Sequence, residues 1–325
     1  MIRRFQGVNV DSGNVGGSGV PCAACDGRAA ADSPLFVHHA HHNDETYTLQ
    51  NCPTCHLKFW WPLRADPSVY ADEGFEAYVD YHAGTRPFPR WAEPLFRNLP
   101  EPAGRALDVG CGDGAVLRRL SESGFKPHGL DLDQKSVAIA RDKYGLENVS
   151  AKTLDEFESE CLGQNRRFDL IMFFEVLEHQ DSPRSFLAQV MRLGRPGGLV
   201  AGSVPNRNRF LARLDRKLSD GDLPPHHFLW FSADALEQLL RRSGFVDVQI
   251  LPTGALPYRE IVAKLIGIAE RKTAKAPLAV KWIRYPLMLA APLVALGTWI
   301  GMRVSPSHLF FRCSVPAIDT KKSAR

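Results

Sequence analysis

The sequence lacks three features that would assign it to common classes of protein. Segment 1–20 contains two arginines but no apolar stretch long enough for a signal peptide, so we expect a cytoplasmic chain. The net charge of +4 over 325 residues is too small to indicate a nucleic-acid partner. With 44% hydrophobic and 23% charged residues, the chain also lacks the composition of a disordered protein. We therefore expect a globular protein with no nucleic acid among its partners.

Cysteine is scarce, but four of the seven cysteines are paired in sequence. Cysteines in a cytoplasmic chain are expected to be metal ligands or free thiols before disulfides. Two C-x2-C pairs predict a structural zinc site, although the 26 residues between the pairs exceed the usual spacing of about 15 to 20. Four thiolates leave no open position on the ion, so it would hold the fold and not react. The predicted ligands are Cys22, Cys25, Cys52 and Cys55.

From residue 104 onward, short apolar runs alternate with stretches of helical periodicity. Such alternation is typical of βαβ units and a mainly parallel sheet, in which the ligand site lies at the carboxyl ends of the strands. The sequence therefore predicts an α/β fold. The apolar runs are 105–109, 125–132, 168–174, 198–204 and 245–251.

A glycine-rich turn follows the first of these strands. Gly110, Gly112 and Gly114 would permit a tight turn, close approach of a ligand to the backbone, and close packing of the next helix. Asp131 ends the second strand, where a carboxylate can accept hydrogen bonds from both hydroxyls of a ribose. We infer a ligand that contains a ribose.

Four segments carry a family resemblance. DVGCGDG, GLDLD, FDLIMFFEVLEH and RPGGLV resemble, in order and spacing, the class I S-adenosylmethionine-dependent methyltransferases. EVLEH and the downstream HFLWFSADALEQLLRRSGF look most like the small-molecule branch that includes the O-methyltransferases of ubiquinone biosynthesis. The leader that ends in CPTCHLKFWWP is similar to the zinc-binding leader of related bacterial methyltransferases, sugar C-methyltransferases included. The resemblance covers about residues 22–251.

The resemblance implies a Rossmann-like, seven-stranded sheet and a small N-terminal zinc-ribbon-like unit. The last strand would be antiparallel and inserted beside the fifth, and 308–315 is the candidate for it. The implied organisation is a disordered N-terminus (1–18), the zinc-ribbon-like unit (19–66), a helical connector (67–103), the methyltransferase domain (104–318, with a basic and apolar insertion at 253–307) and a tail (319–325).

The same resemblance implies the residues that bind S-adenosylmethionine. The glycine loop, Cys111 included, would hold the methionine part, and Asp108 would orient that loop. Asp131, followed by Leu132, would bind the ribose, while Leu154 and Asp155 would contact the adenine edge. Phe174 would flank the sulfonium. The implied set is Asp108, Gly110, Cys111, Gly112, Gly114, Asp131, Leu132, Leu154, Asp155 and Phe174.

A base that removes a proton from the acceptor should follow the fourth strand. His179 lies there, on the same turn as Glu175 and Glu178, and we expect an imidazole beside carboxylates to titrate near working pH. Alternatively, Glu178 and His179 cap the next helix and line the pocket. His227 is the second candidate for the base, and Asn206 could hydrogen-bond the acceptor.

The positive charge of the chain is concentrated in 259–303, which has eight basic and two acidic residues. The tract also contains eighteen consecutive uncharged residues at 285–302, which Pro286 and Pro292 are expected to interrupt. One interpretation is a helical lid over the active site. The other is attachment to an anionic membrane surface from one side, without crossing it.

The function predicted from the sequence is S-adenosylmethionine-dependent methyl transfer to a small-molecule or lipid-linked acceptor, at an oxygen. Two alternatives remain open at this point. One is methylation of a sugar carbon, and the other is a non-catalytic, cofactor-binding module with a zinc ribbon.

Overall fold

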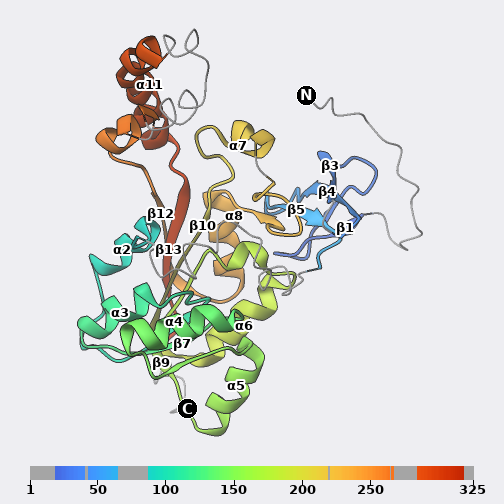
Figure 1. Ribbon diagram of the computed structural model, residues 1–325. Helices are drawn as coiled ribbons and strands as arrows, with labels where there is room; N and C mark the ends of the chain where they lie inside the picture. Colours follow the sequence, from blue (N-terminus) through green and yellow to red (C-terminus); the bar gives the residue numbers. More distant parts are fainter. Residues whose placement is uncertain are drawn as a thin grey trace.

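A computed structural model describes residues 19–40, 43–64, 87–218, 220–263, 265–266 and 284–317. It contains a large central sheet covered by helices and a smaller sheet formed mainly by the N-terminal residues (Figure 1). Several predicted segments lie outside the described residues: the disordered N-terminus (1–18), residues 67–86 of the connector, most of the basic part of the insertion and the whole tail (319–325).

The central sheet has seven strands in the order β12-β13-β10-β9-β6-β7-β8. β13 runs antiparallel between β10 and β12, and it pairs Cys313 with Val200 of β10. The predicted seven-stranded sheet, with an antiparallel last strand beside the fifth, is therefore confirmed. The strands are β6 (Arg105–Val109), β7 (Lys126–Leu130), β8 (Val149–Ser150), β9 (Phe168–Phe174), β10 (Gly194–Pro205), β12 (Val246–Thr253) and β13 (His308–Ser314).

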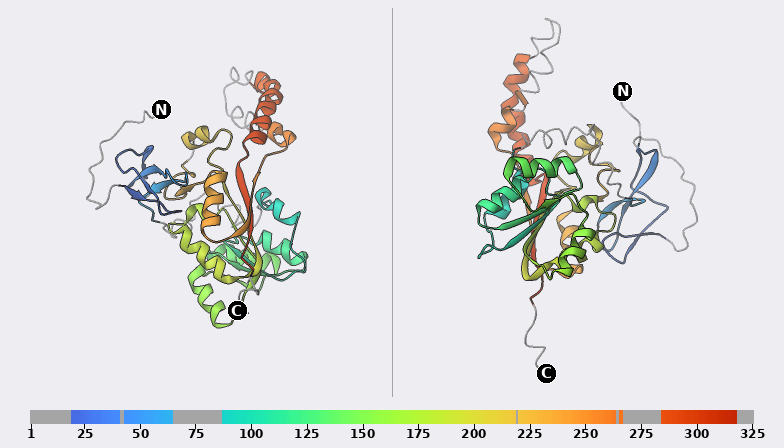
Figure 2. Two further views of the ribbon diagram at one scale, coloured as in Figure 1. Left: turned by 180° about the vertical axis from the view of Figure 1, so that it is seen from behind. Right: turned by 60° about the horizontal axis from the view of Figure 1, so that its bottom comes forward.

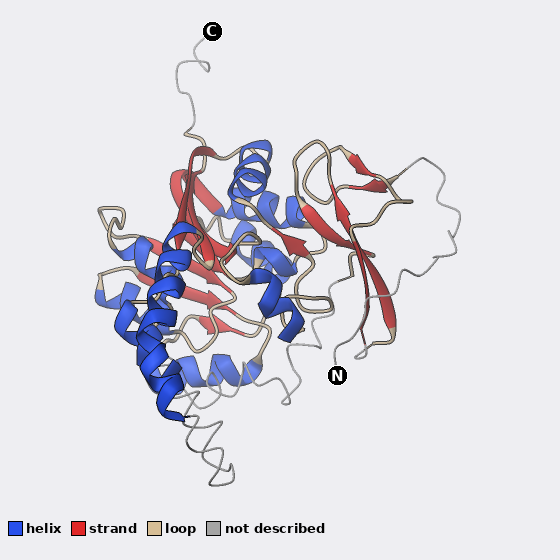
Figure 3. Cartoon of the chain, turned by 90° about the horizontal axis from the view of Figure 1, so that it is seen from above, coloured by secondary structure: helices blue, strands red, loops and turns tan. Residues whose placement is uncertain are grey.

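Helices bury an apolar face on each side of this sheet, as Figure 3 shows from above. One core contains residues of α2 (Glu93–Phe96), α3 (Ala115–Glu122) and α4 (Gln134–Tyr144). The other contains residues of α5 (Leu154–Gly163), α6 (Pro183–Leu193) and α8 (Ala233–Arg242). Polar residues define where helices start: Thr153 and Glu156 form a capping box on α5, and Asp133 caps α4.

The smaller sheet borrows its edge strand from the large domain. Its order is β11-β5-β4-β3, and β11 (Leu229–Trp230) pairs antiparallel with β5 (Lys58–Trp61). Trp60 also donates its backbone N–H to the Phe228 carbonyl at 2.9 Å. The sheet of the zinc-ribbon-like unit is therefore not confined to 19–66. The sequence could not show this, because a two-residue strand carries no periodicity. The remaining strands of this unit are β1 (Val20–Pro21), β2 (Arg28–Ala29), β3 (Phe36–Ala40) and β4 (Glu45–Asn51).

A long helix, α11 (Arg284–Val304), extends away from the sheet and leads into β13 (Figure 2). The helix continues through Pro292, so the expected interruption is wrong in this respect. Pro286 lies in the first turn, where its missing N–H would have had no helical partner. Within the part of the chain that the structure describes, no helix combines the length and apolarity that a membrane span requires.

Candidate functional site

The four predicted zinc ligands lie together in the small unit, and all are buried. The sulfurs of Cys22 and Cys55 are 3.6 Å apart, and those of Cys25 and Cys52 are 3.5 Å apart. Within the first C-x2-C motif, the backbone amide of Ala24 donates to the sulfur of Cys22, and that of Gly27 donates to the sulfur of Cys25. The hydrogen bond between the two thiols lowers the pKa of Cys55 to about 5 and raises the pKa of Cys22, so this pair favours a single thiolate in the absence of an ion. These residues could therefore hold a tetrahedral ion.

The glycine loop has the backbone conformation that its sequence suggests. Gly110, Gly112 and Gly114 all have positive φ angles, of 79°, 51° and 79°, which side chains disfavour. A Cβ at Gly110 would lie 2.5 Å from the Cγ2 of Val176, and one at Gly114 would lie 2.9 Å from the Cβ of Ala140 in α4. The loop therefore needs glycine both for its turn and for close packing against its neighbours.

Two aspartates support the loop in different ways. Asp131 accepts hydrogen bonds from the amides of Gly112 at 2.7 Å and Asp133 at 2.9 Å, so it connects the ends of β6 and β7. Asp108 is buried, and its Oδ1 has no hydrogen-bond partner within the described part of the chain. Burial and the charge of Asp131 raise the pKa of Asp108 well above its usual value. A cationic group next to Asp108 would reverse that shift.

A pocket opens over this loop at the carboxyl ends of β6 and β9. Its lining includes Asp108, Gly112, Cys111, Phe174 and Glu175, together with Trp91 from η2 (Arg90–Ala92). Of the predicted cofactor residues, the lining contains Asp108, Gly110, Cys111, Gly112 and Phe174, whereas Gly114 and Asp131 are not part of it.

The remaining predicted cofactor residues lie outside the lining of this pocket. Leu132 is exposed, directly after Asp131, and Leu154 begins α5 and is partly buried. The Asp155 carboxylate accepts a hydrogen bond from Gln189 of α6. Their assignment to the ribose and the adenine therefore stays a prediction.

Glu175 marks the edge of the pocket and has two partners that the sequence pattern did not indicate. It accepts a hydrogen bond from Ser203 at 2.6 Å and pairs with His308 of β13 at 3.3 Å. Burial raises the pKa of Glu175, but the His308 charge and these hydrogen bonds outweigh it and lower the pKa. The ring of His308 also stacks on Trp91 at 4.8 Å. A single histidine after a long insertion carries no sequence signal for this role.

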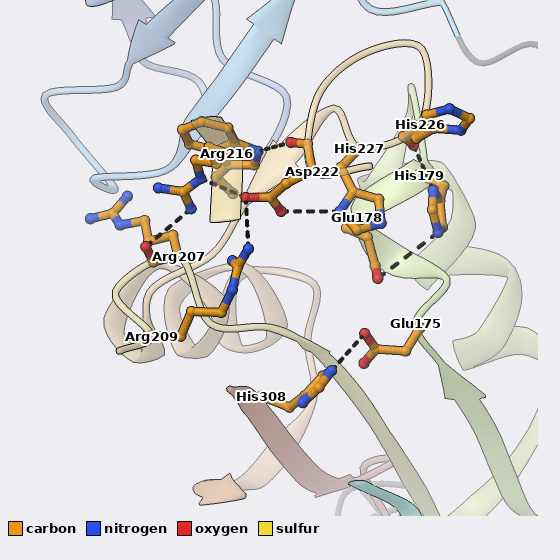
Figure 4. Close-up of polar contacts among 11 residues, drawn as sticks. Glu175, Glu178, His179, Arg207, Arg209, Arg216, Asp222, His226, His227 and His308 are labelled. Carbon is orange, nitrogen blue, oxygen red and sulfur yellow. Dashed lines mark hydrogen bonds and ion pairs between the residues drawn. The ribbon is translucent and has the colours of Figure 1, made fainter. Parts of the chain in front are cut away.

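The next turn, η3 (Leu177–His179), presents a buried carboxylate to two imidazoles (Figure 4). Glu178 has no exposed surface, and neither of its carboxylate oxygens has a hydrogen-bond partner among the described residues. Its Oε1 lies 3.9 Å from Nε2 of His179. The rings of His179 and His227 approach edge-on, with centroids 4.7 Å apart. The structure therefore brings both candidate bases into one cluster.

Polar partners fix the orientation of the two imidazoles. Nδ1 of His179 donates to the carbonyl of His226 at 2.6 Å, and Nδ1 of His227 lies 3.2 Å from Oδ1 of Asp222. Asp222 is in turn paired with Arg209 and Arg216. Burial raises the pKa of Asp222, but the hydrogen bond from His227 and the two arginines lower it to about 2. The sequence did not indicate Asp222, because it lies in an irregular loop.

Two expectations about this region need correction. His179 does not titrate near working pH, because burial and the neighbouring His227 lower its pKa to about 3. The side chain of Asn206 is buried and occupied: it donates to the Pro306 carbonyl and accepts from the Asn208 amide. It is therefore not available to an acceptor in this arrangement.

Comparison with known proteins agrees with this geometry. The methyltransferase domain family matches residues 82–250. A ubiquinone biosynthesis O-methyltransferase from Bordetella avium is 38% identical over 123 residues, which are 36% of this chain and 48% of that protein. A probable S-adenosylmethionine-dependent methyltransferase from Mycolicibacterium smegmatis is 31% identical over 144 residues, 44% of this chain and 52% of that protein. The chain spans about half the length of the curated relatives it matches.

A solved structure shows the same fold. The phosphoethanolamine N-methyltransferase 2 of Haemonchus contortus, in complex with S-adenosyl-L-methionine, aligns with a TM-score of 0.51 at 16% identity. The alignment covers 78% of this chain and 60% of that one. The family match at residues 82–250 covers more than half of this chain, so the chain belongs to the methyltransferase domain family.

Proposed function

We propose that the protein transfers a methyl group from S-adenosylmethionine to an oxygen of a small-molecule or lipid-linked acceptor. The observation that carries the proposal is the pocket at the carboxyl ends of β6 and β9, built from a left-handed glycine loop and the unpartnered carboxylate oxygen of Asp108. Family membership and the likeness to the ubiquinone O-methyltransferases support it.

The residues of the pocket fit the parts of this cofactor. The ammonium group of a methionine moiety would give the buried Asp108 carboxylate a cationic partner, which would lower its raised pKa. The amide of Gly112 is already taken by Asp131, but each carboxylate oxygen of Asp131 can accept a second hydrogen bond, from a ribose hydroxyl. The glycines let a ligand approach the backbone without meeting a side chain.

Methyl transfer needs little covalent chemistry from the protein. The sulfonium of the cofactor supplies a methyl group that is already activated toward a nucleophile. The chain must hold the acceptor oxygen in line with that methyl and help it to lose its proton. Glu175 lies at the pocket edge, held as an anion by His308, and the Glu178–His179–His227 cluster follows it directly. An acceptor bound there would be within reach of both groups.

The test is product analysis with a labelled methyl donor and membrane or cytosolic extracts. We expect one labelled product with an O-methyl group, formed by the wild type and absent with Gly112→Val. A labelled C-methyl sugar would support the alternative of a sugar C-methyltransferase. No product from either extract, combined with cofactor binding, would support the non-catalytic module and contradict the proposal.

The four-cysteine cluster is proposed to hold one structural zinc ion. Four buried thiols with sulfurs 3.5 and 3.6 Å apart, and amides directed at two of them, match the donor set of closed zinc sites. Elemental analysis should find one zinc per chain in protein purified without chelator. Protein that is folded and free of zinc would contradict this assignment.

An apolar face of α11 supports attachment to an anionic membrane, which would bring the site to lipidic acceptors. Leu293, Leu296, Ile300 and Val304 recur every three or four residues and are exposed, Leu293 by 75% and Val304 by 80%. Phe210, which precedes α7 (Ala212–Leu218), lies against Gly301 of α11 and is itself partly exposed. The tract 259–303 carries six more basic than acidic residues, which complements anionic headgroups.

Vesicle flotation tests this attachment. The wild type should bind vesicles of phosphatidylglycerol and phosphatidylcholine more tightly than vesicles of phosphatidylcholine alone, and salt should weaken the difference. The double variant Leu293→Ser, Ile300→Ser should bind at least about tenfold more weakly, since each leucine-sized side chain contributes about 1.5–3 kcal/mol on burial. Leu162→Ser, which changes an exposed leucine on α5, is the matched control. Equal binding by all three proteins would return α11 to the lid interpretation.

A further inference from the structure

Basic side chains gather where the small unit meets the large domain. This basic cluster consists of Lys58 on β5, Arg207 just after β10, and Arg213 and Arg216 on α7. We propose that Lys58, Arg207 and Arg213 bind a phosphate or diphosphate group of the acceptor. The inference rests on the proposed methyl transfer for the identity of the acceptor, whereas binding of the anion itself does not.

The backbone brings these residues together from three segments. Lys58 of β5 is paired with Trp230 of β11, and residues paired in neighbouring antiparallel strands project from the same face of the sheet. The guanidinium of Arg216 lies over the Trp230 ring, 3.8 Å from its centroid. Arg213 precedes Arg216 by three residues on α7, so both lie on one side of that helix. Arg216 also donates to the backbone carbonyl of Arg207 at 3.1 Å.

Three of the four cations lack an anionic partner. Within the described ranges, Lys58, Arg207 and Arg213 take part in no ion pair. Arg207 donates to the carbonyl of His56, and its buried Nε has no hydrogen-bond partner among the described residues. A buried donor without an acceptor is costly, and a bound anion would supply the acceptor. Phosphate oxygens suit this role, because guanidinium groups bind them through paired hydrogen bonds.

The carboxylate beside the basic cluster is already engaged. Asp222 pairs with Arg209 and Arg216 through its Oδ2 and with His227 through its Oδ1 (Figure 4). One negative charge is therefore shared by two arginines and an imidazole. It leaves the positive charge of the other members of the basic cluster without compensation.

The local charges favour an anion most strongly at Lys58. Burial lowers the pKa of Lys58, and the charges of the three arginines of the basic cluster lower it further. Burial also lowers the pKa of Arg207, and Arg216 adds to this effect, whereas the charges of Asp234 and Cys55 oppose it. The field of neighbouring charges is thus positive at Lys58 and partly balanced at Arg207. An anion at the basic cluster would raise the pKa of Lys58 again.

The basic cluster lies at the same edge of the sheet as the cofactor pocket. Arg207 follows the carboxyl end of β10, which pairs in parallel with β9, and the pocket opens where β9 ends. Asp222 also contacts His227, whose ring adjoins that of His179 on the turn after β9. An acceptor held by its phosphate at the basic cluster would therefore extend along this edge toward the pocket.

The first test is binding of inorganic pyrophosphate to the full-length, zinc-loaded chain, measured by calorimetry in buffer without divalent cations. We expect one pyrophosphate per chain, with an affinity that falls as salt is added. The double variant Lys58→Gln, Arg213→Gln should bind at least about tenfold more weakly, because charge-assisted hydrogen bonds are lost. Lys58→Arg, which keeps the charge, should retain most of the affinity. Lys126→Gln is the matched control, because it changes an exposed lysine at the amino end of β7.

The second test uses labelled methyl donor and extract. The double variant should raise the KM for the acceptor at least about tenfold while kcat and the affinity for S-adenosylmethionine barely change, because the phosphate lies away from the reacting atoms. The labelled product should contain phosphorus. Its partition between organic solvent and water then distinguishes a lipid-linked phosphate from a soluble one, and either result supports the inference.

The outcomes separate this site from the proposed function. Absence of pyrophosphate binding by the folded wild type, or equal affinities in wild type and double variant, would overturn the anion site. Pyrophosphate binding combined with an unchanged KM, or with a labelled product free of phosphorus, would overturn its assignment to the acceptor. A wild type that binds pyrophosphate and S-adenosylmethionine but forms no labelled product would contradict the methyl transfer and leave the anion site standing. Circular dichroism identifies any variant that fails to fold, and the wild-type titration tests the site without a substitution.

Discussion

Two clusters of side chains of the kinds that can bind metal ions differ in almost every physical respect. The cysteine cluster has four thiols, all buried, from two short turns of one small unit. The Glu178–His179–His227 cluster has three donors from two distant segments, and both histidines are partly exposed. Four thiolates close the coordination of an ion, whereas three mixed donors leave it open. The first arrangement suits structure and the second suits chemistry.

The two clusters are also physically connected. β11 begins at Leu229, two residues after His227, and completes the sheet of the unit that the cysteines hold. Trp230 donates from its indole N–H to the carbonyl of Asp222, the residue behind His227. A zinc ion held by the cysteine cluster would therefore stabilise the surface against which the second cluster is built. Loss of the cysteine cluster should therefore disturb the Glu178–His179–His227 cluster, whereas substitutions in the latter should not disturb the cysteines.

The largest expected effect comes from breaking the cysteine cluster. Cys52→Ser with Cys55→Ser should abolish zinc binding and unfold the small unit, since such sites contribute on the order of 10 kcal/mol in isolated peptides. Loss of β5 would also release β11, the strand that begins two residues after His227. Zinc content and limited proteolysis measure this effect. Cys161→Ser is the control, because it changes a buried cysteine that lies outside the cluster. A zinc-free variant with an unchanged cleavage pattern would contradict the structural role.

The second effect is on turnover, through the open cluster. His179→Gln should lower kcat by about 10²-fold while the affinity for S-adenosylmethionine barely changes, because a neutral imidazole that positions the acceptor is lost but cofactor binding is not. Because the pKa of His179 is about 3, its titration should produce no inflection in the wild-type profile between pH 6 and 7. Near-normal turnover in the variant would move the role to His227 or to the acidity of the acceptor itself.

Much of the fold could be predicted from the sequence because its signals are local. Alternation of apolar runs and helical stretches placed five of the seven strands of the central sheet, whereas β13 was implied by the resemblance and the two-residue β8 was not predicted. The glycine loop was found from three residues whose φ angles are all positive. The C-x2-C pairs likewise indicated four cysteines that do lie together. In each case neighbouring residues carry the information.

What could not be predicted depends on contacts between distant segments. The partners of Glu175 and His227 are His308 and Asp222, which lie in irregular or late parts of the chain. The pKa of His179 is set by burial, which sequence spacing does not report. β11 is too short to show periodicity, although it joins the two units. The expected break at Pro292 did not occur, because one lost hydrogen bond does not end a 21-residue helix.

The third effect concerns the cofactor pocket, whose lining includes no residue of either cluster. Gly112→Val or Asp131→Ala should weaken S-adenosylmethionine binding more than tenfold in calorimetry. Valine would strain a residue with φ of 51°, and alanine would remove the acceptor that holds the Gly112 amide and that is proposed to bind the ribose. Gly163→Val is the matched control, because a Cβ there meets nothing within 4 Å. Unchanged affinity in both variants would rule out the assignment of this pocket to the cofactor.

The smallest effect separates a compensated buried carboxylate from an uncompensated one. Arg192 lowers the pKa of Glu158 through its hydrogen bonds, outweighing burial, so this pair adds stability above the unfolded-state pKa of about 4.3 and loses it as the pH falls. Glu158→Gln should therefore cost about 1 kcal/mol at pH 7 in urea unfolding, and less near pH 3. Glu178→Gln should cost nothing or stabilise, since burial raises the pKa of Glu178 well above its usual value. If Glu178→Gln proved the more costly change, Glu178 would have a compensating partner in the folded chain.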